Sequence, residues 1–374
     1  MMQFSIDTGS LLQASQIMSR AVSSKTTIPA LTGIYFECIN ENTLLLKATD
    51  LEIGIEHTVS AKVEETGSMV VPAKYLLDIL RKLPNTNITL TKKLDENTLQ
   101  INYRESHVNL NTFPVDQFSF LPGINQDRSL TIKSDILATM IKKISISFSH
   151  DISRPVLNGA LFELTDNMLR FVSSDTYRLS LIETVLDKVS EEEFMPIIIP
   201  SKALIELTRL IDKDETIKII IDNKQAQFET NNLKIGVRLI EGKFPSYKNV
   251  IPTEYSTRII ADTKDLLLSI ERATVISSDE SFNKTCTIKL EFMDNTIYIN
   301  SYSPSIGQLH DKLLINKEGE DISISFNGNY LVDILKIIDT EKVIIELNGN
   351  LSPGIIKPFG STINYLSLIL PVRG

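Results

Sequence analysis

Three segments of the chain share one pattern of hydrophobic and polar positions. In residues 71–83 (VPAKYLLDILRKL), apolar side chains recur at i, i+3, i+4 and i+7 from Leu76 to Leu83. This spacing places them on one face of a helix of about three turns. Residues 199–211 (IPSKALIELTRLI) and 326–338 (FNGNYLVDILKII) repeat the pattern at offsets of 128 and 127 residues. The pattern therefore predicts three equivalent amphipathic helices.

Other predicted elements recur with the same period. A second helical pattern, beginning at a capping Asp or Ser, starts near Asp7, Lys133 and Asp262. Alternating, β-branched segments predict strands after each of these helices, beginning at Leu31, Asn42, Leu157, Asn167 and Asn295. Further strands are predicted after the repeated helix, from Asn87, Thr216 and Lys342.

The repeat predicts an α+β chain built from three copies of one domain. Each copy contains a helix, strands, a second helix and further strands over about 125 residues, an ordinary domain size. The phrases TFPVDQFSFLP from Thr112 and LIEGKFPSYKNVIP from Leu239 end the first two copies. We therefore predict domains at 1–126, 127–253 and 254–374. Identical units joined at a constant angle close into a ring or form a spiral.

Composition is that of a soluble globular protein, with a net acidic charge. The 374 residues carry a formal charge of −9, and 42% of them are hydrophobic. The three predicted domains contribute −3, −1 and −5, so none of them is basic overall. An acidic balance argues against a protein that binds nucleic acid over its whole surface. If one face is positive, the rest of the surface must be strongly acidic.

Cysteine usage and the N-terminus favour the cytoplasm. Cys38 and Cys286 are far apart and show neither disulfide nor metal-site spacing. We see no signal-peptide pattern at the start and no apolar run long enough to span a bilayer.

Basic residues recur on the predicted helices. Lys74, Asp78 and Arg81 occupy i, i+4 and i+7 of the first repeated helix, and the other two helices carry polar residues at the same places. One interpretation is a solvated face with pairs inside each helix. The other is a set of phosphate contacts, independent of base sequence and sensitive to salt. The candidate DNA-facing residues are Lys25, Lys74, Arg81, His150, Lys202, Arg209 and Lys336.

Catalytic signatures are missing from the sequence. It contains no GxGxxG, GxxxxGK[ST], GxSxG or HExxH motif, and its four histidines lack metal-ligand spacing. No cofactor or metal is expected. An α+β metabolic enzyme whose site forms between repeats without a recognisable motif remains the alternative.

At this point the sequence resembles a known family, the bacterial DNA sliding clamp, which is the beta subunit of the replicative DNA polymerase. The resemblance covers the whole chain. Its most specific parts are TIPALTGIYFE from Thr27, ATDLEIGIE from Ala48, VPAKYLLDILRKLP from Val71, SRPVLNGALFE from Ser153, SSDTYRL from Ser173, EGKFPSYKNVIP from Glu241 and LPVRG from Leu370. The resemblance implies a non-enzymatic processivity factor: a head-to-tail homodimer whose six domains surround duplex DNA. A divergent paralogue with other partners would share these motifs.

The resemblance also implies a pocket between the second and third domains that receives linear peptides from polymerases, the clamp loader and repair proteins. Carried over by motif, its residues are Arg154, Val156, Leu157, Ser174, Tyr177, Arg178, Leu179, Pro245, Val250, Leu368, Leu370, Pro371, Val372 and Arg373. The family often has Thr and His where this chain has Ser174 and Tyr177. The implied dimer contact falls on Val108 and Leu110 of one chain and on Val275 and Ile276 of the other.

Overall fold

The computed structural model describes residues 1–93, 97–124, 128–186, 195–277 and 286–372. Within these ranges the chain packs as two compact units. Unit 1 comprises residues 1–136 and 202–239. Unit 2 comprises residues 137–186, 195–201 and 240–372. The second sequence repeat therefore contributes to both units, and the predicted boundary near 126 lies outside the described residues.

Unit 1 contains two antiparallel sheets. The first has the order β5 (Lys62–Glu65), β1 (Met2–Asp7), β7 (Asn87–Lys92), β8 (Thr98–Tyr103) and β9 (Ser106–Asn111). The second has the order β10 (Ser129–Lys133), β15 (Thr216–Ile221), β16 (Gln225–Glu229), β17 (Leu233–Arg238), β4 (Ile53–Ser60), β3 (Thr43–Thr49), β2 (Gly33–Asn40) and β6 (Gly67–Pro72). The pairing of β17 with β4 makes one sheet from strands of two sequence repeats.

Unit 2 repeats this plan. Its larger sheet has the order β14 (Ile197–Pro200), β11 (Gly159–Thr165), β12 (Met168–Ser174), β13 (Arg178–Val185), β26 (Asn364–Ile369), β25 (Gly354–Pro358), β24 (Lys342–Leu347), β18 (Thr257–Asp262) and β22 (Asn316–Gly319). Its smaller sheet has the order β21 (Gly307–Leu314), β20 (Thr296–Ser303), β19 (Thr287–Met293) and β23 (Ile322–Asn327). Here β13 pairs with β26, as β4 pairs with β17 in unit 1.

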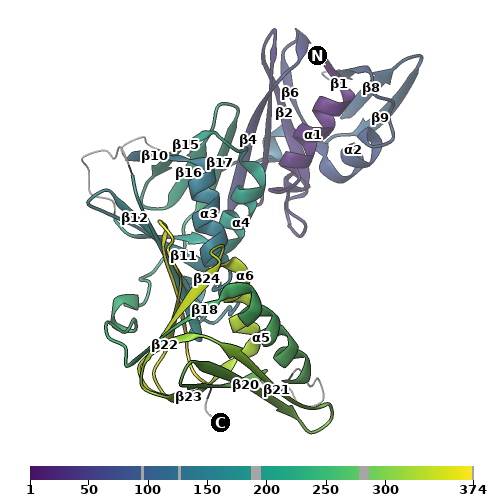
Figure 1. Ribbon diagram of the computed structural model, residues 1–374. Helices are drawn as coiled ribbons and strands as arrows, with labels where there is room; N and C mark the ends of the chain where they lie inside the picture. Colours follow the sequence, from purple (N-terminus) through teal and green to yellow (C-terminus); the bar gives the residue numbers. More distant parts are fainter. Residues whose placement is uncertain (94–96, 125–127, 187–194, 278–285, 373–374) are drawn as a thin grey trace. The chain divides into compact units, whose positions relative to one another are not determined.

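The helices lie where the sequence pattern predicts them. They are α1 (Thr8–Met18), α2 (Ala73–Leu80), α3 (Ser134–Ser145), α4 (Ser201–Leu210), α5 (Thr263–Ser277) and α6 (Gly328–Ile337), with short 3₁₀ turns η1 (Pro29–Thr32), η2 (Val115–Gln117), η3 (Pro155–Leu157) and η4 (Tyr247–Asn249). Asp7 caps α1 by accepting a hydrogen bond from the Ser10 N–H. Figure 1 shows α5 and α6 side by side, with α5 against β20 and β21.

Each helix buries one apolar stripe against the sheets. In α2 the buried side chains are Ala73, Leu76, Leu77 and Leu80, whereas Lys74 is exposed. The strands alternate buried and exposed positions in the same way, as in β20. No helix in the described ranges combines the length and hydrophobicity that crossing a bilayer requires.

Candidate partner-binding site

A tight turn between β12 and β13 forms one side of the predicted peptide site. The Asp175 carboxylate accepts hydrogen bonds from the N–H groups of Tyr177 (3.0 Å) and Arg178 (2.9 Å). The Ser174 hydroxyl donates to the Arg178 carbonyl oxygen at 2.9 Å. Thr176 has a φ of +79°, a left-handed conformation that these side-chain bonds stabilise. The turn holds the Tyr177 side chain outward, 61% exposed.

The Arg178 side chain is fixed by contacts from three residues. Its Nε donates to Asp175 at 2.9 Å, and one terminal nitrogen donates to Asp333 of α6 at 2.7 Å. The guanidinium carbon lies 4.2 Å from the centre of the Tyr330 ring. Through its bonds to these two carboxylates, Arg178 holds the turn against α6.

Tyr330 is a residue of this site that the sequence motifs do not predict. It occupies the same repeat position as Tyr75, whose side chain is 60% exposed, so it resembles a solvent-facing helical residue. The second repeat has Ala203 at this position. The aromatic residue in the third repeat is the one sequence difference that could have drawn attention to Tyr330.

A buried apolar cluster lies beneath the predicted site. Leu157, Leu179 and Leu368 are each at most 4% exposed and belong to this cluster together with Phe244 and Tyr247. Leu179 and Leu368 lie opposite each other on β13 and β26. Sequence motifs far apart in the chain therefore meet in one core.

Exposed apolar groups surround this cluster. Val250, after η4, is 51% exposed, and Leu370, after β26, is 38% exposed. The Leu370 N–H donates to the Tyr177 carbonyl oxygen at 2.9 Å, which joins the C-terminal segment to the turn. Of the remaining predicted residues, Arg154 and Pro245 are exposed, and Val156, Ser174, Pro371 and Val372 are half-buried; Arg373 lies outside the described residues.

A polar network fixes η4, the segment that directly precedes Val250. The Tyr247 hydroxyl donates to the Glu163 carboxylate at 2.6 Å, and Arg170 donates to Glu163 at 2.8 Å and also to Glu183. Burial alone would raise the pKa of Glu163, but the hydrogen bonds from Tyr247 and Arg170 outweigh it and hold that pKa below its usual value. Burial and the bond to Glu163 raise the pKa of Tyr247.

This depressed pKa predicts a pH-dependent contribution to stability. Ionised Glu163 stabilises the fold above the unfolded-state pKa of about 4.3, and this contribution is lost as pH falls through the lower folded-state value. In Tyr247→Phe the neutral-pH stability should fall by about 1 kcal/mol, and the difference from wild type should shrink toward pH 3. Urea unfolding at pH 7 and pH 3 measures both values. A difference that stays constant over this range would contradict the assignment.

The candidate DNA-facing residues are all exposed in their respective units, but most of the cations have carboxylate partners. Arg81 pairs with Asp78 at 3.1 Å and Arg209 with Glu206 at 2.7 Å, both within three residues. Lys202 pairs with Asp50 at 2.6 Å, and Lys336 with Glu271 at 2.9 Å. The short-range pairs that the first interpretation expects are thus present for both arginines. Lys25, Lys74 and His150 are exposed and form no ion pair with another described residue.

The candidate dimer residues lie at the margins of the two units. Val108 and Leu110 are half-buried on β9, the last strand of its sheet. Val275 is 64% exposed and Ile276 half-buried on the final turn of α5. β21 is likewise the last strand of its sheet. The last strand of a sheet offers unpaired backbone groups to a partner.

Comparison with known proteins gives one consistent result. Models of the N-terminal, central and C-terminal domains of the DNA polymerase III beta subunit match residues 2–122, 131–246 and 248–373. The beta sliding clamp of Staphylococcus aureus strain Mu50 is 32% identical over 383 residues, with both chains covered completely.

Solved structures agree over the full length. The sliding clamp of Bacillus subtilis is 29% identical with a TM-score of 0.95, covering 100% of this chain and 99% of that one. The beta chain from Streptococcus pneumoniae is 30% identical with a TM-score of 0.94, and that of Pseudomonas aeruginosa bound to griselimycin is 26% identical with a TM-score of 0.92, each with complete coverage of both chains. The chain therefore belongs to the family of DNA polymerase III beta subunits, the bacterial beta sliding clamps.

Proposed function

We propose that this sliding clamp captures partner peptides on one surface of unit 2 and faces duplex DNA with the exposed cations of its helical segments. As a member of the family it is a non-catalytic accessory subunit of DNA polymerase. A clamp that surrounds DNA acts through effective concentration, since a tethered polymerase rebinds its template intramolecularly. Affinity for DNA can then remain low, which permits sliding.

The peptide surface is the part of the proposal with the most support from geometry. We assign to it the exposed side chains of Tyr177, Val250 and Leu370 around the buried Leu179 and Leu368. Apolar groups beside a packed cluster suit an apolar anchor of a linear peptide. The remaining residues assigned to this surface from the family motifs are Arg154, Val156, Leu157, Ser174, Arg178, Pro245, Pro371, Val372 and Arg373. The Pseudomonas aeruginosa clamp was solved with griselimycin bound, and a clamp that holds a ligand is consistent with such a surface.

A substitution at Val250 tests this surface. Val250→Asp should weaken a labelled peptide containing a glutamine and a Leu-Phe anchor by about tenfold, because an aspartate would have to be desolvated against the apolar anchor. Fluorescence anisotropy measures the affinity.

The control carries the same charge change elsewhere in unit 2. Leu351 is 74% exposed in the segment between β24 and β25. Leu351→Asp should bind the peptide as wild type does. Equal affinity of all three proteins would refute the peptide surface.

For DNA we assign the contact to Lys25, Lys74, Arg81, His150, Lys202, Arg209 and Lys336. Lys25 and Lys74 should contribute most, since the two arginines, Lys202 and Lys336 already have carboxylate partners. We further propose that the sequence repeats 1–126, 127–253 and 254–374 are the clamp domains and that the acidic surplus lies away from these cations. The two buried free cysteines fit a cytoplasmic protein.

Topological linkage to DNA is tested by cutting the DNA. After loading onto nicked circular DNA by a clamp loader, the protein should co-elute with the circle through gel filtration in high salt. Linearisation with a single-cutting nuclease should release most of it, because a ring slides off a free end. Protein that stays bound after linearisation would show that it holds DNA by contact rather than by encirclement.

A further inference from the structure

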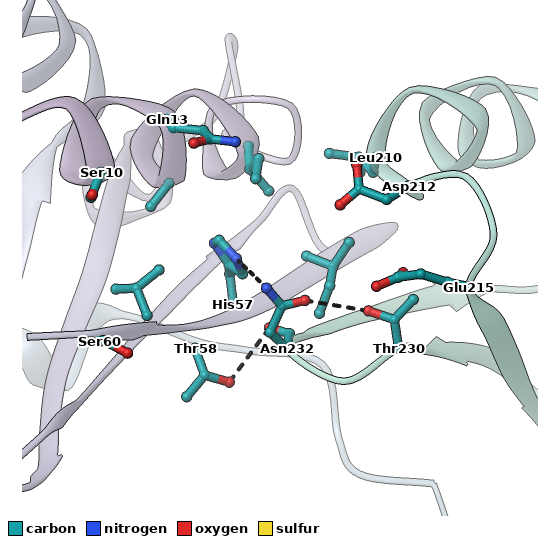
Figure 2. Close-up of a pocket in the computed structure, with 14 residues that line it drawn as sticks. Ser10, Gln13, His57, Thr58, Ser60, Leu210, Asp212, Glu215, Thr230 and Asn232 are labelled. Carbon is teal, nitrogen blue, oxygen red and sulfur yellow. Dashed lines mark hydrogen bonds between the residues drawn. The ribbon is translucent and has the colours of Figure 1, made fainter.

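Unit 1 contains a cavity of about 430 Å³ that the clamp function does not use. It lies between α1, the end of α4, β4 and the turn joining β16 to β17 (Figure 2). Its apolar wall includes Ala14, Ile17 and Leu233. Asp212 and Glu215 supply its two carboxylates. A cavity of this size accommodates a small organic molecule.

In unit 2 the equivalent space is filled by a lysine. The side chain of Lys143, on α3, is 4% exposed. Its ammonium donates to the carbonyl oxygen of Ile337 at 2.6 Å and pairs with Asp339 at 3.1 Å. It also lies 5.4 Å from the centre of the Tyr365 ring. An ammonium is thus held at the end of α6 by a helix carbonyl, a carboxylate and an aromatic face.

The internal repeat identifies the matching positions in unit 1. The buried stripe of α1 aligns with that of α3 at an offset of 126, which places Ile17 at the position of Lys143. Between α4 and α6 the offset is 127, so Leu210 and Asp212 correspond to Ile337 and Asp339.

Strand register and a shared turn support this alignment. Leu233 lies opposite His57 on β4, as Tyr365 lies opposite Ile182 on β13. The turns that precede β4 and β13 share one hydrogen bond. Asp50 accepts from the Ile53 N–H, as Asp175 accepts from the Arg178 N–H. Ile17 and Leu233 of unit 1 therefore stand where unit 2 has Lys143 and Tyr365. Their smaller side chains leave the space that forms the cavity.

Unit 1 keeps counterparts of the groups that accept from the Lys143 ammonium in unit 2, but it has isoleucine in place of the lysine. Asp212 and Glu215 form no ion pair with another described residue. The carbonyl of Leu210 is at the end of α4, where it has no partner within the helix. Around the cavity, α1 contributes Ser10 and Gln13, and the β16–β17 turn contributes Thr230 and Asn232. Among the described residues, no lysine or arginine lines it.

His57 adds a second observation at the same place. Its side chain lines the cavity and is buried, 7% exposed, and one nitrogen approaches the Asn232 amide at 3.4 Å. The other nitrogen, Nδ1, has no hydrogen-bond partner among the described residues. Burial lowers the pKa of His57, so the ring is neutral at pH 7 and does not offset the two carboxylates.

From this arrangement we infer that the cavity binds an aliphatic primary ammonium group. The carbon chain packs against Ala14, Ile17 and Leu233, and the ammonium lies between the Asp212 carboxylate and the final carbonyl of α4, as the Lys143 ammonium does in unit 2. The group can belong to a free diamine or to a lysine side chain. This inference is independent of peptide capture and of the DNA contact.

Calorimetric titration of the full-length protein tests the inference, with 1,5-diaminopentane and pentylamine as ligands and 1-pentanol as the uncharged probe. We expect the amines to bind and pentanol to bind at least tenfold more weakly. Titration with Nα-acetyl-lysine amide distinguishes the two sources: a lysine side chain is favoured if it binds more tightly than the diamine, and a free diamine if it binds more weakly. Failure of all the amines to bind at millimolar concentration would overturn the inference.

Three variants locate the binding. Asp212→Asn should weaken amine binding at least tenfold, whereas Asp214→Asn, in the same turn but outside the cavity lining, should leave it unchanged. Ile17→Lys should place an ammonium in the cavity from within the chain and abolish amine binding while the protein stays folded by circular dichroism. Equal amine affinity in wild type and Asp212→Asn would overturn the inference, even if Ile17→Lys failed to fold.

Discussion

Replacing Val275 with arginine should leave a chain of 42.0 kDa in solution in place of an assembly of twice that mass. Val275 is 64% exposed on the last turn of α5, where the family resemblance predicts a dimer contact with Val108 and Leu110 of a second chain. A guanidinium buried against these side chains would have no counter-ion, and an unpaired buried charge costs several kcal/mol. A penalty of about 4 kcal/mol weakens association roughly a thousandfold.

Sedimentation equilibrium measures the mass directly. Leu351→Arg, also at an exposed apolar side chain of unit 2, should remain dimeric. The monomeric variant should also fail to stay on nicked circular DNA after loading, because an open chain cannot be topologically linked. A Val275→Arg protein that sediments as a dimer would place the interface elsewhere.

Local structure follows closely from the sequence because each repeat carries its own apolar pattern. The predicted strands from Thr216 and Lys342 begin at those residues, and the capping role expected of Asp7 is observed. The predicted helix at 71–83 is shorter than the pattern, since it ends at Leu80 and Arg81 follows as its cap. Periodicity records which face is buried, and burial is what stabilises these short helices.

The hydrophobic pattern of the sequence does not predict which distant strands and side chains pack together. The pattern of β4 and β17 gives no indication that they pair across two repeats, because any half-buried edge can satisfy the same alternation. The peptide-site residues came from family motifs, and the structure gathers Leu157, Leu179 and Leu368 into one cluster. The Arg170 network and the cavity depend on side chains that meet only after folding.

Replacing Arg170 with methionine should cause the largest loss of stability among the variants considered. Its guanidinium is 20% exposed and lies between Glu163 and Glu183, whose side chains are 16% and 14% exposed. Removing it leaves two largely buried carboxylates without a counter-charge, and such losses cost about 3 kcal/mol. Urea unfolding at pH 7 measures the change in the free energy of unfolding.

Peptide binding should fall with stability, because Arg170 also contacts the Tyr247 hydroxyl at 3.2 Å and so supports the segment that carries Val250. We expect about threefold weaker peptide binding in Arg170→Met, a loss of about 0.6 kcal/mol.

Arg81→Met is the stability control: it removes an exposed ion pair and should lower the free energy of unfolding by under about 1 kcal/mol. Adding Glu163→Gln and Glu183→Gln to Arg170→Met removes the unpaired charges and should recover much of the stability. If the triple variant is no more stable than Arg170→Met, packing of the arginine stem rather than charge pairing stabilises this part of unit 2.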